Sequence, residues 1–191
     1  MDILDFISGI MDGVSEEDIQ NLLEKSGASN LAGTVPDGGE FMFCGVPFIR
    51  LGEEQGGILC ITKQDIFRSK FNETDNNDYR ESTVRHRLLE EFLPQLDCEE
   101  LLPFEMNLAS AVDNSQGHGV CTDYVGILTE ELYRKYRRYV RTDGYMWLCT
   151  PYSVDGNYPY VRYVGASGVV VNYYAINAYR CRPACIFKKS S

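Results

Sequence analysis

The most reactive side chains of this 191-residue chain are seven cysteines, an odd number with no C-x2-C pair. Two of them, Cys181 and Cys185, stand four residues apart and could share one face of a strand. A catalytic thiol needs a lowered pKa, and a metal site needs further soft ligands. The sequence around the pair shows neither signal. We therefore interpret the cysteines as small core residues of a protein in a reducing compartment.

Other reactive groups are sparse. His118 and Cys121 form an H-x2-C fragment, but a structural zinc site needs four ligands and two are missing. His86 lies between two arginines and is expected at the surface. The chain contains no G-x-S-x-G, P-loop or dinucleotide-binding glycine motif. We therefore predict no enzymatic activity, no metal and no cofactor.

Tyrosine dominates the last third of the chain, where 12 of the 13 tyrosines lie at or beyond Tyr124. Tyrosine offers a large contact area with few torsions to order, and asparagine adds adaptable hydrogen bonds, as in antibody-like binding surfaces. Strand alternation predicts Tyr158, Tyr160 and Arg162 on one face and Val161 in the core. The predicted partner-binding residues are Tyr152, Asn157, Tyr158, Tyr160, Arg162, Tyr163, Asn172, Tyr173, Tyr174, Asn177 and Tyr179.

A purely structural interpretation of these tyrosines is also open. They could half-bury their rings against the turns of an aromatic-rich sheet. The only tryptophan, Trp147, stands in the segment YMWLC between apolar neighbours. Its surroundings favour packing in the core over display to a ligand.

The net charge of −10 is unevenly distributed. Residues 1–131 carry 8 basic and 26 acidic side chains, a balance of −18, whereas residues 132–191 carry 10 basic and 2 acidic ones, a balance of +8. An acidic surface can imitate nucleic-acid phosphates and dock in the basic cleft of a host nucleic-acid enzyme, as an anti-CRISPR-like inhibitor would. The alternative acidic face comprises Glu90, Glu91, Glu99 and Glu100. The competing interpretation is a solvated surface that maintains solubility.

The basic segment YRKYRRYVR, residues 133–141, also has two interpretations. Arginine interleaved with tyrosine suits single-stranded nucleic acid through charge and stacking. The same pattern suits the end of an amphipathic helix that partly buries Tyr133, Tyr136 and Tyr139. The segment could also contact the acidic half of a second copy and form a homo-oligomer.

The N-terminal region reads as a separate element. Ser15 and Asp18 form a capping box ahead of an apolar stripe, so residues 1–26 are predicted to be a helical appendage. Residues 27–39 read as a linker, and residues 40–191 as the main domain. No apolar run is long enough for a membrane span. Asp2 and Asp5 stand where a secretory signal carries basic residues, so we expect a cytoplasmic protein or one carried in a phage particle.

The main domain is predicted to be α+β, with an antiparallel sheet closing the chain. A hairpin is expected over 40–52, and helices are expected after Ser82 or Thr83 and after Thr129, the first ending at Pro94. Strands are expected at 57–62, 124–128, 145–150, 160–164, 168–174 and 182–187.

The order of these elements resembles the DUF6273 family of bacterial and phage proteins. Its blocks match Phe43–Leu51, the YRESTVRHRLLEEFL segment at 79–93, Gly126–Tyr136, the WLCTP segment at 147–151 and the CRPAC segment at 181–185. Cys149 stands in place of the family's arginine and Cys181 in place of its valine.

The resemblance implies a C-type-lectin-like fold over residues 38–187 and a phage or mobile-element origin. It implies a protein or carbohydrate partner, bound on a variable surface between the tryptophan motif and the last strand. It transfers no activity. The formylglycine-generating enzymes share this fold and a C-terminal cysteine pair, so a cysteine-dependent enzyme is a further alternative.

Overall fold

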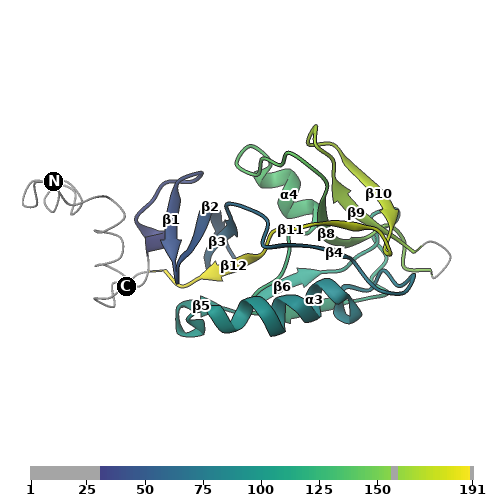
Figure 1. Ribbon diagram of the computed structural model, residues 1–191, viewed down its shortest axis with the longest axis horizontal. Coiled ribbons are helices and arrows are strands. Elements are labelled where there is room, and N and C mark those ends of the chain that lie inside the picture. Colours follow the sequence, from purple (N-terminus) through teal and green to yellow (C-terminus); the bar gives the residue numbers. More distant parts are fainter. Residues whose placement is uncertain (1–30, 156–158, 190–191) are drawn as a thin grey trace, which may run out of the picture.

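The computed structural model describes residues 31–155 and 159–189, and within them the chain is α+β, as predicted. These residues form two five-stranded sheets, one two-stranded sheet and two short α-helices (Figure 1). The predicted helical appendage at 1–26 lies outside the described residues.

The first sheet has the strand order β1-β2-β3-β12-β5. Its strands are β1 (Glu40–Phe43), β2 (Val46–Glu54), β3 (Gly57–Thr62), β12 (Ala184–Phe187) and β5 (Leu101–Leu102). The predicted hairpin is present as β1 and β2, turning through Cys44 and Gly45, both with positive φ. All residues of β3 and β12 are buried, which explains their nearly continuous apolar sequences.

The second sheet has the order β10-β9-β8-β11-β4. It contains β10 (Val170–Tyr174), β9 (Tyr160–Val164), β8 (Met146–Pro151), β11 (Ala178–Cys181) and β4 (Phe67–Lys70). Its pairings are antiparallel except for that between β11 and β8, which is parallel. The C-terminal strands therefore divide between two sheets, because β12 leaves this sheet and pairs with β3.

A third, two-stranded sheet joins β6 (Phe104–Asn107) to β7 (Val120–Asp123). The prediction of a strand at 124–128 was wrong, because the strand in this region comes earlier, as β7. Residues Val125–Leu128 are buried, and only Gly126 makes a bridge, to Ala184. Their apolar run reflects burial without strand pairing.

Both predicted helix starts are confirmed. In α3 (Thr83–Arg87) the Ser82 hydroxyl accepts a hydrogen bond from the Arg85 amide at 3.0 Å, and in α4 (Glu130–Tyr136) Thr129 caps the Leu132 amide at 3.2 Å. The first helix continues through a π-helical turn, Leu88–Phe92, and ends in a 3-10 turn, Leu93–Gln95, that contains Pro94. The two helices lie on opposite sides of β4, β8 and β11 (Figure 1).

Three further 3-10 turns occur at Leu31–Gly33, Tyr79–Glu81 and Cys98–Glu100. The first of these belongs to the segment expected to be a linker. Residues 31–39 instead pack on the domain, because Ala32 is fully buried and Arg50 donates hydrogen bonds to the carbonyls of Ala32 and Val35. The domain therefore includes residues from Leu31 onward, which corrects the expected start at residue 40.

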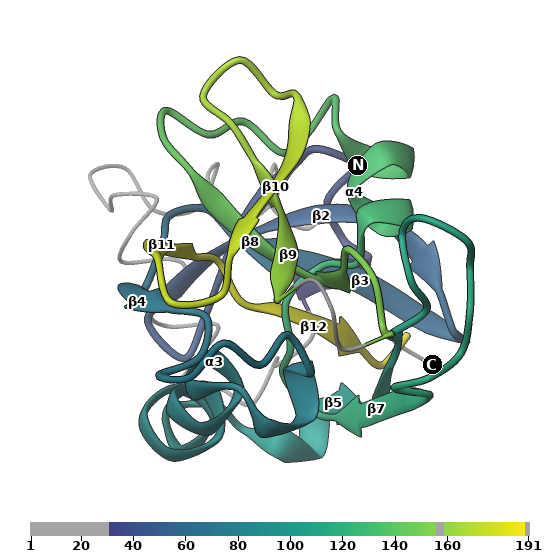
Figure 2. The same cartoon turned by 90° about the vertical axis from the view of Figure 1, so that its right-hand side faces the viewer.

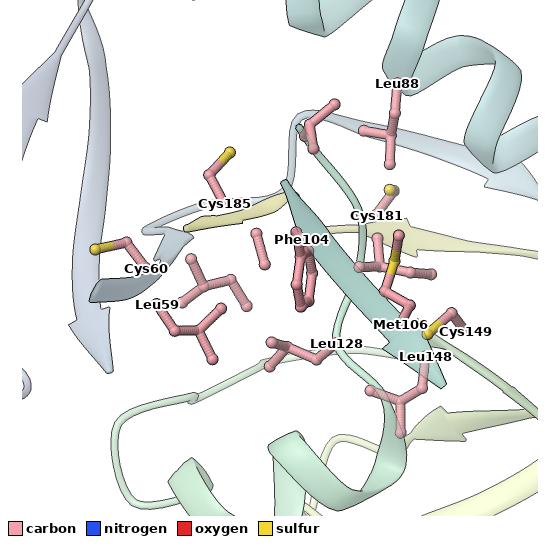
Figure 3. Close-up of a cluster of buried hydrophobic side chains, with 14 of the residues drawn as sticks. Leu59, Cys60, Leu88, Phe104, Met106, Leu128, Leu148, Cys149, Cys181 and Cys185 are labelled. Carbon is pink, nitrogen blue, oxygen red and sulfur yellow. The ribbon is translucent and has the colours of Figure 1, made fainter. Parts of the chain in front are cut away.

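The core lies between the sheets and is rich in sulfur. Figure 3 shows Cys149, Cys181 and Cys185 among apolar side chains that include Met106 and Phe104, and all of these are fully or almost fully buried. Five of the seven cysteines are buried and act as small hydrophobic groups, as predicted, whereas Cys44 and Cys98 are exposed, so the prediction was wrong for these two.

Candidate functional site

Trp147 packs on the buried face of the second sheet and links its strands. Its side chain is 1% exposed, and the indole Nε1 donates to the Ser69 carbonyl at 3.1 Å. The indole packs 4.5 Å from the Tyr179 ring and 5.6 Å from the Phe71 ring, centroid to centroid. The prediction that Trp147 is a core residue is therefore confirmed.

Tyrosine rings extend this packing outward to the surface. Tyr163 and Tyr179 lie 4.7 Å apart and are half-buried, and both contact Tyr145, which is 51% exposed. Burial, reinforced by neighbouring phenols, raises the pKa of Tyr179 to about 12. The phenol of Tyr179 therefore stays protonated at neutral pH and can donate a hydrogen bond.

A second group of rings lies on the opposite face of the same sheet. Tyr160 packs 4.6 Å from Tyr174 and 6.0 Å from Tyr152. The two groups meet at β10, where the rings of Tyr173 and Tyr174 are 5.7 Å apart. Successive residues of a strand point to opposite faces, so β10 presents one ring to each side. Tyr173 is 45% and Tyr174 41% exposed.

The predicted binding residues are therefore not on a single face. Tyr160 and Arg162 do share a face, with Val161 fully buried on the other, as predicted. Arg162, however, is engaged by Glu130 through bonds of 2.6 and 3.1 Å, and it also reaches Asn172. The Asn177 amide folds back on the Tyr174 carbonyl. Asn157 and Tyr158 lie outside the described residues.

The backbone of β10 is open on one side. The Gly165 amide donates to the Val169 carbonyl and the Ala175 amide to the Pro159 carbonyl, so these positions face β9. Hydrogen-bonding direction alternates along an antiparallel strand, which places the backbone groups of Val171 and Tyr173 toward β9. The amides of Val170, Asn172 and Tyr174 then point away from the sheet. Within the described residues β10 has no strand on that side.

The side chains along this strand add to its openness. Residues 168–176, GVVVNYYAI, contain no charged residue and no proline. Val169, Val171, Tyr173, Tyr174 and Ile176 are all exposed. Proteins usually protect an edge strand with charge or proline, and β4 at the other edge of this sheet carries Arg68 and Lys70. We call the outer side of β10, residues 170–174, together with the exposed Val169 and Ile176 that flank it, the open edge (Figure 2).

Sequence reasoning did not single out Val169, Val171, Tyr145 or Ile176 as part of this surface. An uncharged β-branched run next to tyrosines is an unusual composition only for a strand that lies at the edge of a sheet. Nothing in the local sequence shows which strand lies at an edge.

The structure describes the residues that the sequence singled out for chemistry, Cys181, Cys185, Cys121 and His118. Cys181 and Cys185 are fully buried and lie in strands of different sheets, and burial raises the pKa of both thiols well above the ordinary value. Cys121 is also buried, and its thiol lies 3.3 Å from Asp123 Oδ2. His118 Nε2 lies 2.9 Å from Asn77 Oδ1. Among the described residues no group of three or more possible ligands could hold a metal ion.

The acidic alternative is divided between the helical segment that starts with α3, which carries Glu90 and Glu91, and the 3-10 turn Cys98–Glu100. Glu90, Glu91 and Glu99 are exposed and Glu100 is half-buried. Glu91 forms a bidentate pair with Arg87, with bonds of 2.8 and 2.7 Å. This pairing lowers the pKa of the Glu91 carboxyl and places a positive charge beside the negative charge that Glu91 would present to a basic partner.

The tyrosines of the basic segment 133–141 are buried or half-buried as expected for the end of an amphipathic helix, whereas several of its arginines stay exposed. Tyr133 and Tyr136 are buried and Tyr139 is half-buried, as expected for an amphipathic helix end. Arg134 and Lys135 form ion pairs with Glu130 and Glu54. Arg137, Arg138 and Arg141 remain exposed.

Comparisons with protein families, with curated proteins and with solved structures found no match for this chain. No helix in the described part of the chain has the length and apolar character to cross a membrane.

Proposed function

We propose that this protein is a non-catalytic binding domain that receives an extended segment of another protein along the open edge of β10. The observation that carries the proposal is the combination of outward-pointing backbone amides with an uncharged, exposed strand. Main-chain groups of this kind bind an added strand through ladder hydrogen bonds, and side chains flanking the strand determine which sequence is accepted.

The tyrosines supply the flanking contacts. Tyr173 on one face and Tyr174 on the other can pack against alternate side chains of an added strand. Their supports are rigid, because Tyr173 rests 6.5 Å from Tyr179, itself packed on Trp147, and Tyr174 rests on Tyr160. Rings held in place before binding lose little conformational entropy on contact.

This arrangement favours a protein over the carbohydrate that the DUF6273 resemblance also allows. A sugar would engage tyrosine faces but leave the edge amides without partners, whereas a strand satisfies both. The acidic inhibitor remains a separate hypothesis, tested by neutralising Glu90, Glu99 and Glu100 together. It predicts salt-sensitive binding of a basic nucleic-acid enzyme that is lost in this variant.

The test is selection of binding peptides from a displayed random library, followed by affinity measurements on variants. Val171→Lys introduces a charge on the open edge, and Asn172→Pro removes an outward amide. Both should weaken binding at least tenfold. The matched control is Val120→Lys, since Val120 is a similarly exposed valine on β7 in another sheet. Its variant should bind normally.

Two results would refute the proposal. One is a set of selected peptides whose affinity is unchanged by Val171→Lys and Asn172→Pro. The other is a dimer of the free protein that dissociates on Val171→Lys, because a second copy would then occupy the edge. A glycan array read with the same variants tests the carbohydrate alternative.

A further inference from the structure

A basic cleft lies away from the open edge, where three connections of the chain converge. It has a volume of about 320 Å³ and is lined by residues from the segment after β3, the segment before β8 and the passage from β11 to β12. The charged residues that line it are Lys63, Asp65, Arg141, Asp143, Arg180 and Arg182. Four cations and two carboxylates line the cleft, and Glu40, which pairs with Lys63, reduces the surplus to one positive charge.

Arg182 is the unusual member of this group. Arg182 is only 5% exposed, yet among the described residues its guanidinium contacts backbone carbonyls and no carboxylate. Nε and Nη2 donate to the Thr62 carbonyl at 2.9 and 2.5 Å, and Nη1 donates to the Arg141 carbonyl at 2.7 Å. Burial lowers the pKa of Arg182 to about 10, with Asp65 opposing the shift. A buried cation without a paired anion is costly, and proteins seldom keep one without a use.

The guanidinium of Arg182 keeps N–H donors that are not used by the two carbonyls. A guanidinium carries five N–H groups, and the three bonds to the two carbonyls leave two of them. The carbonyl contacts also fix the plane of the guanidinium, so its orientation is set before any ligand arrives. A planar fork held in this way matches two oxygens of a tetrahedral oxyanion.

The other cations differ in how far they are already neutralised. Arg180 is held by Asp65 at 3.2 Å and Asp143 at 2.5 Å, and Lys63 pairs with Glu40 at 2.6 Å. Arg141 is exposed and has no ion pair within the described residues. The two cations of the cleft without a carboxylate partner among the described residues are therefore Arg182, inside the cleft, and Arg141, at its mouth.

We propose that this cleft binds the phosphate group of a small phosphorylated molecule. A phosphate monoester carries close to two negative charges at neutral pH, so it can pair with both arginines that lack a carboxylate partner. The Arg182 fork would hold two phosphate oxygens, and Arg141 would close on the third. The volume lies at the lower end of the range for small-molecule sites, so it suits a compact ligand such as a sugar phosphate.

The test is titration of the full chain with inorganic phosphate and with ribose 5-phosphate at constant ionic strength, observed through the arginine Nε–H resonances. We expect the chemical shift of the Arg182 Nε–H resonance to change with ligand concentration and to reach saturation. Arg141→Gln should weaken binding at least tenfold. The matched control is Arg137→Gln, which removes the same charge from an exposed arginine outside the cleft, and it should bind as the unaltered chain does.

Arg182→Gln alters a buried group and can prevent folding, so Arg141→Gln carries the mutational test. The proposal is overturned if the Arg182 resonance does not move. It is also overturned if Arg137→Gln and Arg141→Gln weaken binding equally, because the effect would then be general charge screening. If acetate binds to the cleft with the same affinity as phosphate, the assignment to phosphate is contradicted.

Discussion

The buried hydroxyl of Tyr79 provides a sharp test of the packing described above. Tyr79 is fully buried, and its hydroxyl makes no hydrogen bond to any described residue. Its ring packs against Phe71, and the thiols of Cys149, Cys181 and Cys121 are among its electrostatic neighbours. A buried hydroxyl without a partner costs about 1–3 kcal/mol of stability. Tyr79→Phe removes this cost and leaves the ring in place, so we expect the free energy of unfolding to rise by about 1 kcal/mol.

Tyr133→Phe is the matched control, and it should change the free energy of unfolding in the opposite direction. Tyr133 is also buried, but its hydroxyl donates to the Gly168 carbonyl at 3.0 Å. Tyr133→Phe leaves that carbonyl without its donor and should lower the free energy of unfolding by about 1 kcal/mol.

Urea unfolding monitored by Trp147 fluorescence measures both variants under identical conditions. The expected difference between them is about 2 kcal/mol, well above the error of a comparison between midpoints. The reasoning is refuted if Tyr79→Phe destabilises the protein as much as Tyr133→Phe does. That result would mean that the Tyr79 hydroxyl has a partner in solution.

Two further predictions concern titration and thiol reactivity. Burial lowers the pKa of His118 below 6.5, with Asp78 opposing and Arg80 reinforcing the shift, so the unfolded chain takes up a proton first and stability should fall as the pH drops below about 6.5. His118→Gln should flatten this pH dependence in urea midpoints measured from pH 7.5 to 5. An unchanged dependence would contradict the assignment to His118. Cys44 and Cys98 are exposed and the other five cysteines are buried. Two thiols should therefore react rapidly with a disulfide reagent, and the other five should react only on unfolding. More than two rapidly reacting thiols would contradict the described core.

Local signals in the sequence determined much of the fold. Ser82 and Thr129 mark helix starts because their hydroxyls satisfy amides within three residues, a requirement that depends on no distant partner. The buried run at 57–62 and the alternation around Val161 similarly report local burial. These predictions were confirmed because the physics that sets them is short-range.

Pairing between distant segments could not be derived in this way. β4 pairs with β11 and β3 with β12, each across more than a hundred residues, and no local pattern encodes such a register. For the same reason, the sequence predicted a tyrosine-rich surface but not that its rings would divide between two faces and meet at an edge strand. The cleft around Arg182 was missed because its liners come from three separate connections.

Amide hydrogen exchange along β10 tests the central proposal most directly. In the free protein the amides of Val171 and Tyr173 should exchange slowly, because they face β9, and those of Val170 and Asn172 should exchange rapidly. A bound peptide should slow exchange at Val170 and Asn172 and leave the other two unchanged. Rapid exchange at Val170 and Asn172 in the saturated complex would show that the ligand binds elsewhere and would contradict pairing at the open edge.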